Sequence, residues 1–215
     1  MLHTDHALAL TPDDLITSAS LSVQALTPLL DHDWETRAGE LEWRCQRTLD
    51  HISDALLFYA LLLANRATDR LAPVRNGYPD ATVPELLEIV RGSARMLAEI
   101  ARGVGPEEHA FHPSGMGDAE GFIGMGCEEI LVHTWVICQG LGAWFQPPDD
   151  LARRITQRVF PWAPIDQPWA GLLWATGSVV LPDRERLGPD WWYHPGPLSQ
   201  WDGTINRRTT PPAWA

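Results

Sequence analysis

Apolar side chains recur at steps of three or four residues through most of the first 160 positions, which is the spacing of one helical face. Helix starts stand near Pro12 and Pro84, where a preceding threonine can cap the helix and proline fits its first turn. Glycines near positions 103 and 140 end two of the patterns. We therefore expect helices over residues 12–30, 40–68, 82–102, 118–140 and 149–160.

The second and fourth of these helices are apolar on all sides in their middle parts, residues 55–64 and 130–138. A helix of that kind is buried on most sides, so the first 145 residues fit a bundle of four long helices. Bundles build cofactor and metal sites in their cores, from side chains on facing helices. The pattern therefore directs the search for chemistry to these two helices.

The composition changes after residue 160. Residues 161–215 hold nine of the eighteen prolines and seven of the eleven tryptophans. We expect a short helix over 169–176, then two short strands, 177–181 and 191–194, which form a small β-hairpin. From Thr204 onward the tail is expected to be irregular or disordered.

This organisation predicts a mainly α protein in two parts, a bundle over residues 1–160 and a Trp/Pro-rich extension over residues 161–215 that packs on it. Two interpretations of the extension's tryptophans stay open. They either cover the open end of the bundle as the apolar wall of a pocket, which would suit a planar or aromatic substrate, or simply pack an irregular appendage.

The charge of the chain limits the classes of partner that it can bind. The 215 residues carry 28 acidic and 16 basic side chains, and every basic one is arginine. A net charge of −12 argues against nucleic acid and against an anionic membrane surface as partners. The absence of lysine excludes Schiff-base chemistry. No signal peptide or spanning segment is apparent, and three cysteines are too few for a disulfide framework, so we expect a cytoplasmic monomer or homodimer that acts on a small molecule.

Polar residues stand where the helical pattern calls for apolar ones. Glu129 and His133 lie one turn apart on an inward-facing stripe of the fourth helix. His51 directly precedes the apolar run of the second helix. A buried carboxylate without a partner would cost several kcal/mol, so Glu129 needs a hydrogen-bond donor, a cation or a metal. Two histidines and one carboxylate form a three-ligand set of the kind found in catalytic zinc sites and iron(II) facial triads.

Other residues could complete such a site. Asp54 lies one turn from His51 and could orient its ring, or could be the last polar residue before the core. His112 could line the entrance, and Phe58 and Trp135 are further candidates for the pocket wall. A simpler interpretation also stands, in which Glu129 and His133 share a local hydrogen bond and His51 is a core histidine bonded to a carbonyl.

Motifs at residues 41–51, 112–122, 124–135, 160–164, 172–177 and 197–203 span nearly the whole chain. The first reads LEWRC…TLDH and the third GMGCEEILVHTW. They resemble the motifs of the DinB-like metalloenzymes, and within them the actinobacterial group named for mycothiol-dependent maleylpyruvate isomerase. The resemblance implies a DinB-like four-helix bundle in which His51, Glu129 and His133 hold a divalent metal, zinc first, with nickel and iron as alternatives. It also implies a low-molecular-weight thiol such as mycothiol as cofactor or co-substrate.

Two positions depart from that group's pattern. It commonly has aspartate where this chain has Val136, and arginine where this chain has Ser178. The resemblance still predicts a thiol-dependent isomerase or S-transferase acting on a small electrophile, in which the metal generates the thiolate. Two alternatives remain: a metal-dependent hydrolase or oxygenase without a thiol, and a non-catalytic helical binding or stress-response module.

Overall fold

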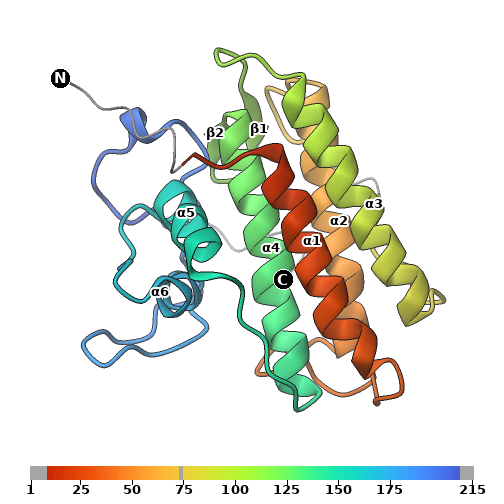
Figure 1. The fold of residues 1–215 in the computed structure, drawn as a ribbon. Coiled ribbons are helices and arrows are strands. Elements are labelled where there is room, and N and C mark those ends of the chain that lie inside the picture. Colours follow the sequence, from red (N-terminus) through yellow and green to blue (C-terminus); the bar gives the residue numbers. More distant parts are fainter. Residues whose placement is uncertain (1–8, 73–74, 209–215) are drawn as a thin grey trace.

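The computed structural model describes residues 9–72 and 75–208. Its α-helices are α1 (Pro12–Leu26), α2 (Cys45–Ala64), α3 (Val83–Arg102), α4 (Ala119–Gly140), α5 (Asp149–Val159) and α6 (Pro168–Ala175) (Figure 1). Short 3₁₀ turns follow at Thr27–Leu29 and Leu198–Gln200, and β1 (Ala110–His112) pairs antiparallel with β2 (Gly115–Gly117). The prediction of a mainly helical protein is confirmed, and the helix packing is consistent with a bundle.

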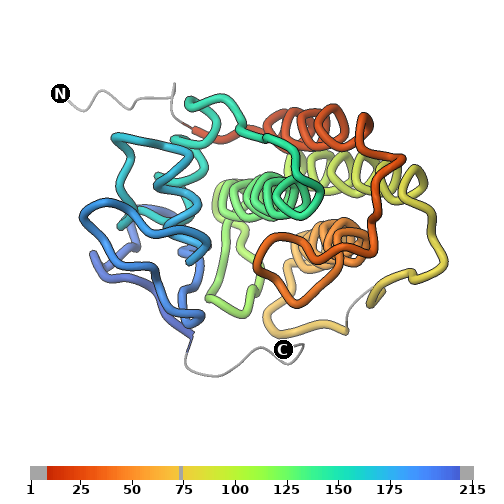
Figure 2. The backbone as a smooth tube through the Cα atoms, turned by 90° about the horizontal axis from the view of Figure 1, so that it is seen from below, coloured from red at the N-terminus to blue at the C-terminus, as the bar shows by residue number. Residues whose placement is uncertain are grey.

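Helices α1 to α4 form the bundle, and α4 lies at its centre. It contacts α1, α2 and α3 on one side and α5 on the other, and α6 packs on α5 (Figure 2). Residues of α4 from Gly121 to Cys138 are therefore almost all buried, whichever way they point. By length and composition α4 could span a membrane, but 89% of the qualifying window is buried inside this fold, as in the core helix of a bundle.

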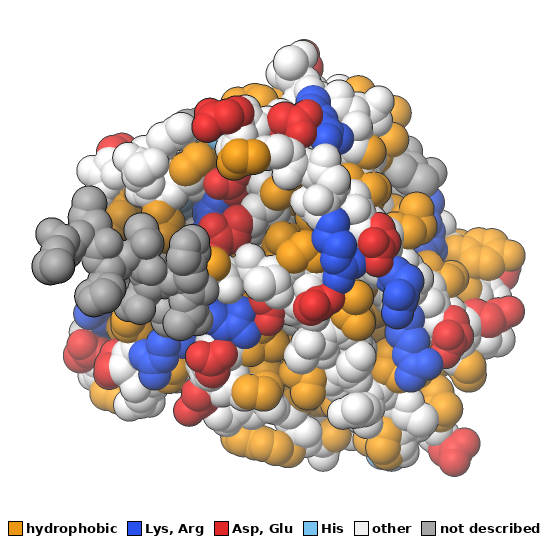
Figure 3. All heavy atoms as spheres, turned by 45° about the horizontal axis from the view of Figure 1, so that its top comes forward, with side chains coloured by type: hydrophobic (Ala, Val, Ile, Leu, Met, Phe, Trp, Pro, Cys, Tyr) orange, Lys and Arg blue, Asp and Glu red, His pale blue; other side chains and the backbone are white. Residues whose placement is uncertain are grey.

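The surface mixes charges of both signs. In the face shown in Figure 3, arginines and carboxylates lie interspersed among apolar side chains. Ion pairs between neighbouring exposed side chains include Arg91 with Glu88 and Arg102 with Glu99.

Asp14 ties α5 to the start of α1. Its carboxylate accepts hydrogen bonds from the backbone N–H and hydroxyl of Thr11 and from both terminal nitrogens of Arg154, each of the latter at 2.8 Å. Burial raises the pKa of Asp14, but the bonds from Arg154 and Thr11 outweigh it, so the pKa lies below its usual value of 3.8. The ionised form is therefore the one that the fold stabilises.

Replacing Asp14 with asparagine is expected to lower the free energy of unfolding at neutral pH by about 2 kcal/mol, because charged hydrogen bonds to Arg154 are lost. A carboxyl with a depressed folded-state pKa stabilises above its unfolded pKa, and that contribution disappears as pH falls through the folded value. Urea unfolding from pH 7 to pH 3 should therefore show the two proteins converging in acid. Glu88→Gln on the exposed pair is the control and should change nothing measurable, and a constant gap across pH would contradict the assignment.

The predicted second helix is too long. In the structure, α2 begins at Cys45 instead of residue 40. The residues before it form a turn in which Ala38 N–H donates to Trp43 O and Cys45 N–H donates to Thr36 O. It ends at Ala64 instead of residue 68, since Arg66 takes a positive φ of 47° that no helix allows. The other helices match the predicted ranges within two residues, except that the last turn of the first is 3₁₀.

The predicted β-hairpin is wrong. Gly177, with φ of 66°, turns the chain after α6, and Leu181 then forms only an isolated bridge with Arg184. The backbone N–H of Trp192 instead donates to Asn206 O, so the tail occupies the position given to the first strand. The sheet that does form lies in the loop before α4. Residues 204–208 are irregular as expected, and the rest of the tail lies outside the described residues.

Candidate metal site

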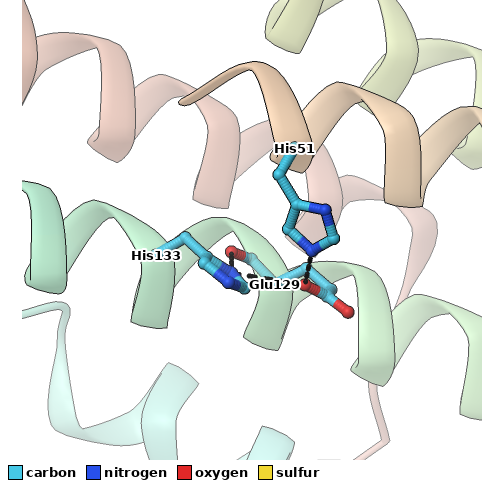
Figure 4. A group of neighbouring side chains, drawn as sticks. All are labelled: His51, Glu129 and His133. Carbon is cyan, nitrogen blue, oxygen red and sulfur yellow. Dashed lines mark hydrogen bonds and ion pairs between the residues drawn. The ribbon is translucent and has the colours of Figure 1, made fainter. Parts of the chain in front are cut away.

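His51, Glu129 and His133 come together between α2 and α4. One ligand atom from each can be chosen so that all three lie within 4.8 Å of one another. His51 reaches across from α2, while Glu129 and His133 stand one turn apart on α4 (Figure 4). The two imidazole rings lie edge to face with centroids 5.0 Å apart. The group meets the steric requirement for holding a divalent metal ion.

The Glu129 carboxylate has two unlike oxygens. Oε1 accepts hydrogen bonds from the hydroxyls of Tyr59 at 2.9 Å and Tyr193 at 3.2 Å. Oε2 is buried and receives no hydrogen bond of good geometry from the part of the chain that the structure describes, although it lies 3.5 Å from His51 Nε2 and 3.2 Å from His133 Nδ1. Burial raises the pKa of Glu129, but the contacts with His51, His133 and Tyr59 outweigh it and lower the pKa to about 2. The site therefore directs an ionised carboxylate oxygen toward two imidazole rings.

His133 is oriented as metal-binding histidines are. Its Nδ1 lies 2.8 Å from the backbone carbonyl oxygen of Glu129, so the proton on Nδ1 can be donated there. Burial lowers the pKa of His133, against the opposing charge of Glu129, and so favours the neutral ring. A neutral ring with its proton on Nδ1 has a free electron pair on Nε2, and a carbonyl partner of this kind is common behind a metal ligand.

A second buried carboxyl stands beside the first. Glu128 is 2% exposed, and within residues 9–72 and 75–208 its side chain is hydrogen-bonded only to the hydroxyl of Tyr193. Burial, and then the charge of Glu129, raise the pKa of Glu128 well above its usual range. As a neutral acid, Glu128 can donate its proton to Tyr193, whose own proton is then free for Glu129.

Sequence reasoning missed Glu128, Tyr59 and Tyr193. Tyr59 could have been found, because positions 51, 55 and 59 share an i, i+4 row on α2. The spacing of Glu128 suggests a solvent-facing residue, because it lies on the side of α4 that is turned away from the bundle core. In the folded protein the extension covers that side. Tyr193 gives no local signal at all, as it reaches the site only through the tertiary packing of the extension.

His51, Glu129 and His133 line a cavity of about 710 Å³. Asp54, Phe58 and His112 line it as well, but Trp135 is not among its lining residues. Burial lowers the pKa of His112 to about 3, so this histidine is neutral, and its Nδ1 pairs with the hydroxyl of Ser114 at 2.6 Å.

Asp54 does not orient His51. Its carboxylate pairs instead with Arg47 at 3.0 Å and Arg75 at 3.2 Å. Asp50, the residue before His51, also pairs with Arg75 and accepts a hydrogen bond from Tyr78 N–H at 2.6 Å. Asp54 thus joins α2 to the loop that follows it.

Both interpretations of the tryptophans hold for part of the set. Trp191 and Trp192 line the cavity, and the guanidinium of Arg208 stacks over Trp192 at 3.8 Å from the ring centroid. Trp169 and Trp174 are buried in the core instead. The extension therefore supplies one wall of the cavity.

The two departures from the family pattern, Val136 and Ser178, both line the cavity. The wall is consequently apolar and neutral at the positions where the resembled group commonly carries an aspartate and an arginine.

The comparisons with protein-family models, with curated proteins and with solved structures find no match.

Proposed function

We propose that this chain is a divalent-metal-dependent enzyme with a DinB-like bundle, and that it uses a small thiol in an isomerisation or S-transfer reaction. The observation that supports a metal is the buried Oε2 of Glu129, which faces two imidazoles and accepts no hydrogen bond of good geometry from the described residues. The 3.5 Å between His51 Nε2 and that oxygen is close to the separation of about 3.3 Å that neighbouring ligands of a tetrahedral zinc ion require.

A divalent ion held by His51, Glu129 and His133 would act as a Lewis acid that turns a thiol into a thiolate at neutral pH. The chain's own part is to orient that site and to enclose it. Tyr59 and Tyr193 fix the carboxylate, the backbone carbonyl of Glu129 fixes His133, and Trp191 and Trp192 shield one side of the cavity from water.

The chain's own cysteines favour an external thiol. Cys45, Cys127 and Cys138 are fully buried. Burial raises the pKa of Cys45 to about 11, of Cys127 to about 12 and of Cys138 to about 11, so none is a thiolate at neutral pH. None of the three lines the cavity. A sulfur nucleophile in this cavity would therefore have to enter with a ligand.

The thiol is tested on protein loaded with cobalt(II), whose visible spectrum reports its ligands. Titration with 2-mercaptoethanol is expected to produce a saturable thiolate-to-cobalt charge-transfer band, because the ion keeps a position open to the cavity. Trp144→Phe, at a ring 79% exposed, is the matched control and should give the same band.

A cobalt spectrum that shows a bound ion but does not change when thiol is added would overturn the proposed use of a thiol. It would leave metal-dependent hydrolysis or oxygen chemistry as the function to test. Failure of the protein to bind cobalt at all would favour a non-catalytic helical module.

A further inference from the structure

Two tyrosine hydroxyls contact the same oxygen of Glu129. A carboxylate oxygen has two lone pairs for hydrogen bonds. The hydroxyls of Tyr59 and Tyr193 lie 2.9 Å and 3.2 Å from Oε1, so together they can fill both positions on that oxygen, and the hydroxyl of Tyr193 also contacts Glu128. Oε2 receives no hydrogen bond from any described residue, and it is the oxygen that faces His51 and His133.

Packing fixes these two hydroxyls from two different parts of the fold. Tyr59 belongs to α2 and is 4% exposed, with its ring edge-on to Phe122 at 5.9 Å between centroids. Tyr193 belongs to the extension, is equally buried, and lies 5.3 Å from the ring of Phe160. Neither ring can turn away without opening the core, so the carboxylate is held by the bundle and the extension together.

We infer that Tyr59 and Tyr193 are positioning residues that make Glu129 a monodentate metal ligand. With Oε1 held by the tyrosines, only Oε2 would be available to an ion, which would then have three protein ligand atoms, whereas a bidentate Glu129 would give it four. At least one coordination position stays open, on the side of the cavity where substrate or thiol would enter. This inference rests on the proposed metal site and goes beyond it, since it assigns a role to residues that are not ligands.

A purely structural role predicts something different. If the tyrosines only satisfied a buried carboxylate, removing a hydroxyl would destabilise the metal-free protein and leave the geometry of a bound ion unchanged. If they hold the carboxylate monodentate, the released Oε1 can turn toward the ion and raise its coordination number. The visible spectrum of cobalt(II) distinguishes these cases, because its intensity and band positions depend on coordination number.

Tyr59→Phe is the cleaner variant, because the Tyr59 hydroxyl is hydrogen-bonded to one carboxylate, Glu129, whereas that of Tyr193 is shared between Glu129 and Glu128. We expect cobalt(II) to bind about 10-fold more weakly in a chelator competition, as is typical when an outer partner of a metal ligand is removed. The cobalt bands should weaken and shift as the second oxygen coordinates. Tyr78→Phe, at a ring 55% exposed, should bind cobalt with wild-type affinity and spectrum.

The outcomes separate this inference from the proposed function. Wild-type affinity and spectrum in both Tyr59→Phe and Tyr59→Phe/Tyr193→Phe, each folded by circular dichroism, would overturn the positioning role while the metal site stands. A changed spectrum in a protein that binds no thiol would support the positioning role and overturn the thiol chemistry. A wild-type chain that binds no cobalt would overturn both.

Discussion

His51→Ala is expected to weaken zinc binding by at least about 100-fold, because even the outer partners of a metal site are each worth about 10- to 100-fold in affinity. His51 is the sole contribution of α2 to the three-residue group, so its loss leaves two ligands on one helix. Its side chain is 20% exposed, and the truncation should leave the bundle folded. Isothermal titration of the metal-free protein with zinc measures the change.

The matched control for that measurement is His32→Ala. His32 lies in an exposed bend before α2 and does not belong to the group, so its removal tests for loss of an adventitious surface ligand. Equal losses of affinity in the two variants would contradict the site. Glu129→Gln adds a second check, since glutamine keeps an oxygen for the two tyrosines but puts an amide nitrogen, which cannot ligate, where Oε2 stands.

Gly121→Ala is expected to destabilise the protein by about 3 kcal/mol, because the new methyl group has no room. A Cβ at Gly121, in the first turn of α4, would lie 2.8 Å from the carbonyl carbon of Pro195 and closer still to its oxygen. Backbone cannot yield as a flexible side chain can. The segment around Pro195 must move away, and Tyr193 is two residues from it.

Urea unfolding and metal binding together test this. The variant should lose both stability and zinc affinity, because the hydroxyl of Tyr193 leaves Glu129 when the extension shifts. Gly92→Ala is the comparison in the interior of α3, where a Cβ meets nothing within 4 Å. It should instead stabilise by about 0.5–1 kcal/mol, as alanine restricts the unfolded chain. Destabilisation by both substitutions alike would contradict the close approach of the extension.

Helix positions were predictable because they depend on local spacing. The pattern also placed His51, Glu129 and His133 on the two most apolar helices, where their polarity is conspicuous. It overextended α2, because the bonds that hold residues 36–45 in a turn are made by backbone groups that leave no trace in hydrophobic periodicity. Periodicity describes which face is buried, and it does not register where a competing turn stops a helix.

The extension was not predictable, because its contacts are made over long sequence distances. Trp192 pairs with Asn206, and Tyr193 reaches a carboxylate 64 positions earlier. The strand-like run at 191–194 is an aromatic cluster: Trp191, Trp192 and Tyr193 all line the cavity, and Trp191 forms only an isolated bridge with Arg207 within the described residues. For the same reason Glu128 could not be recognised as buried until the segment that covers it was placed.

The claim at the centre of this account is that the three side chains hold a metal ion. Elemental analysis of the purified chain, after dialysis against metal-free buffer, tests it most directly. We predict one divalent ion per chain, retained through dialysis in the wild type and lost in His51→Ala. A wild-type protein that keeps no metal after loading with zinc, or a His51→Ala protein that retains as much as the wild type, would contradict the claim.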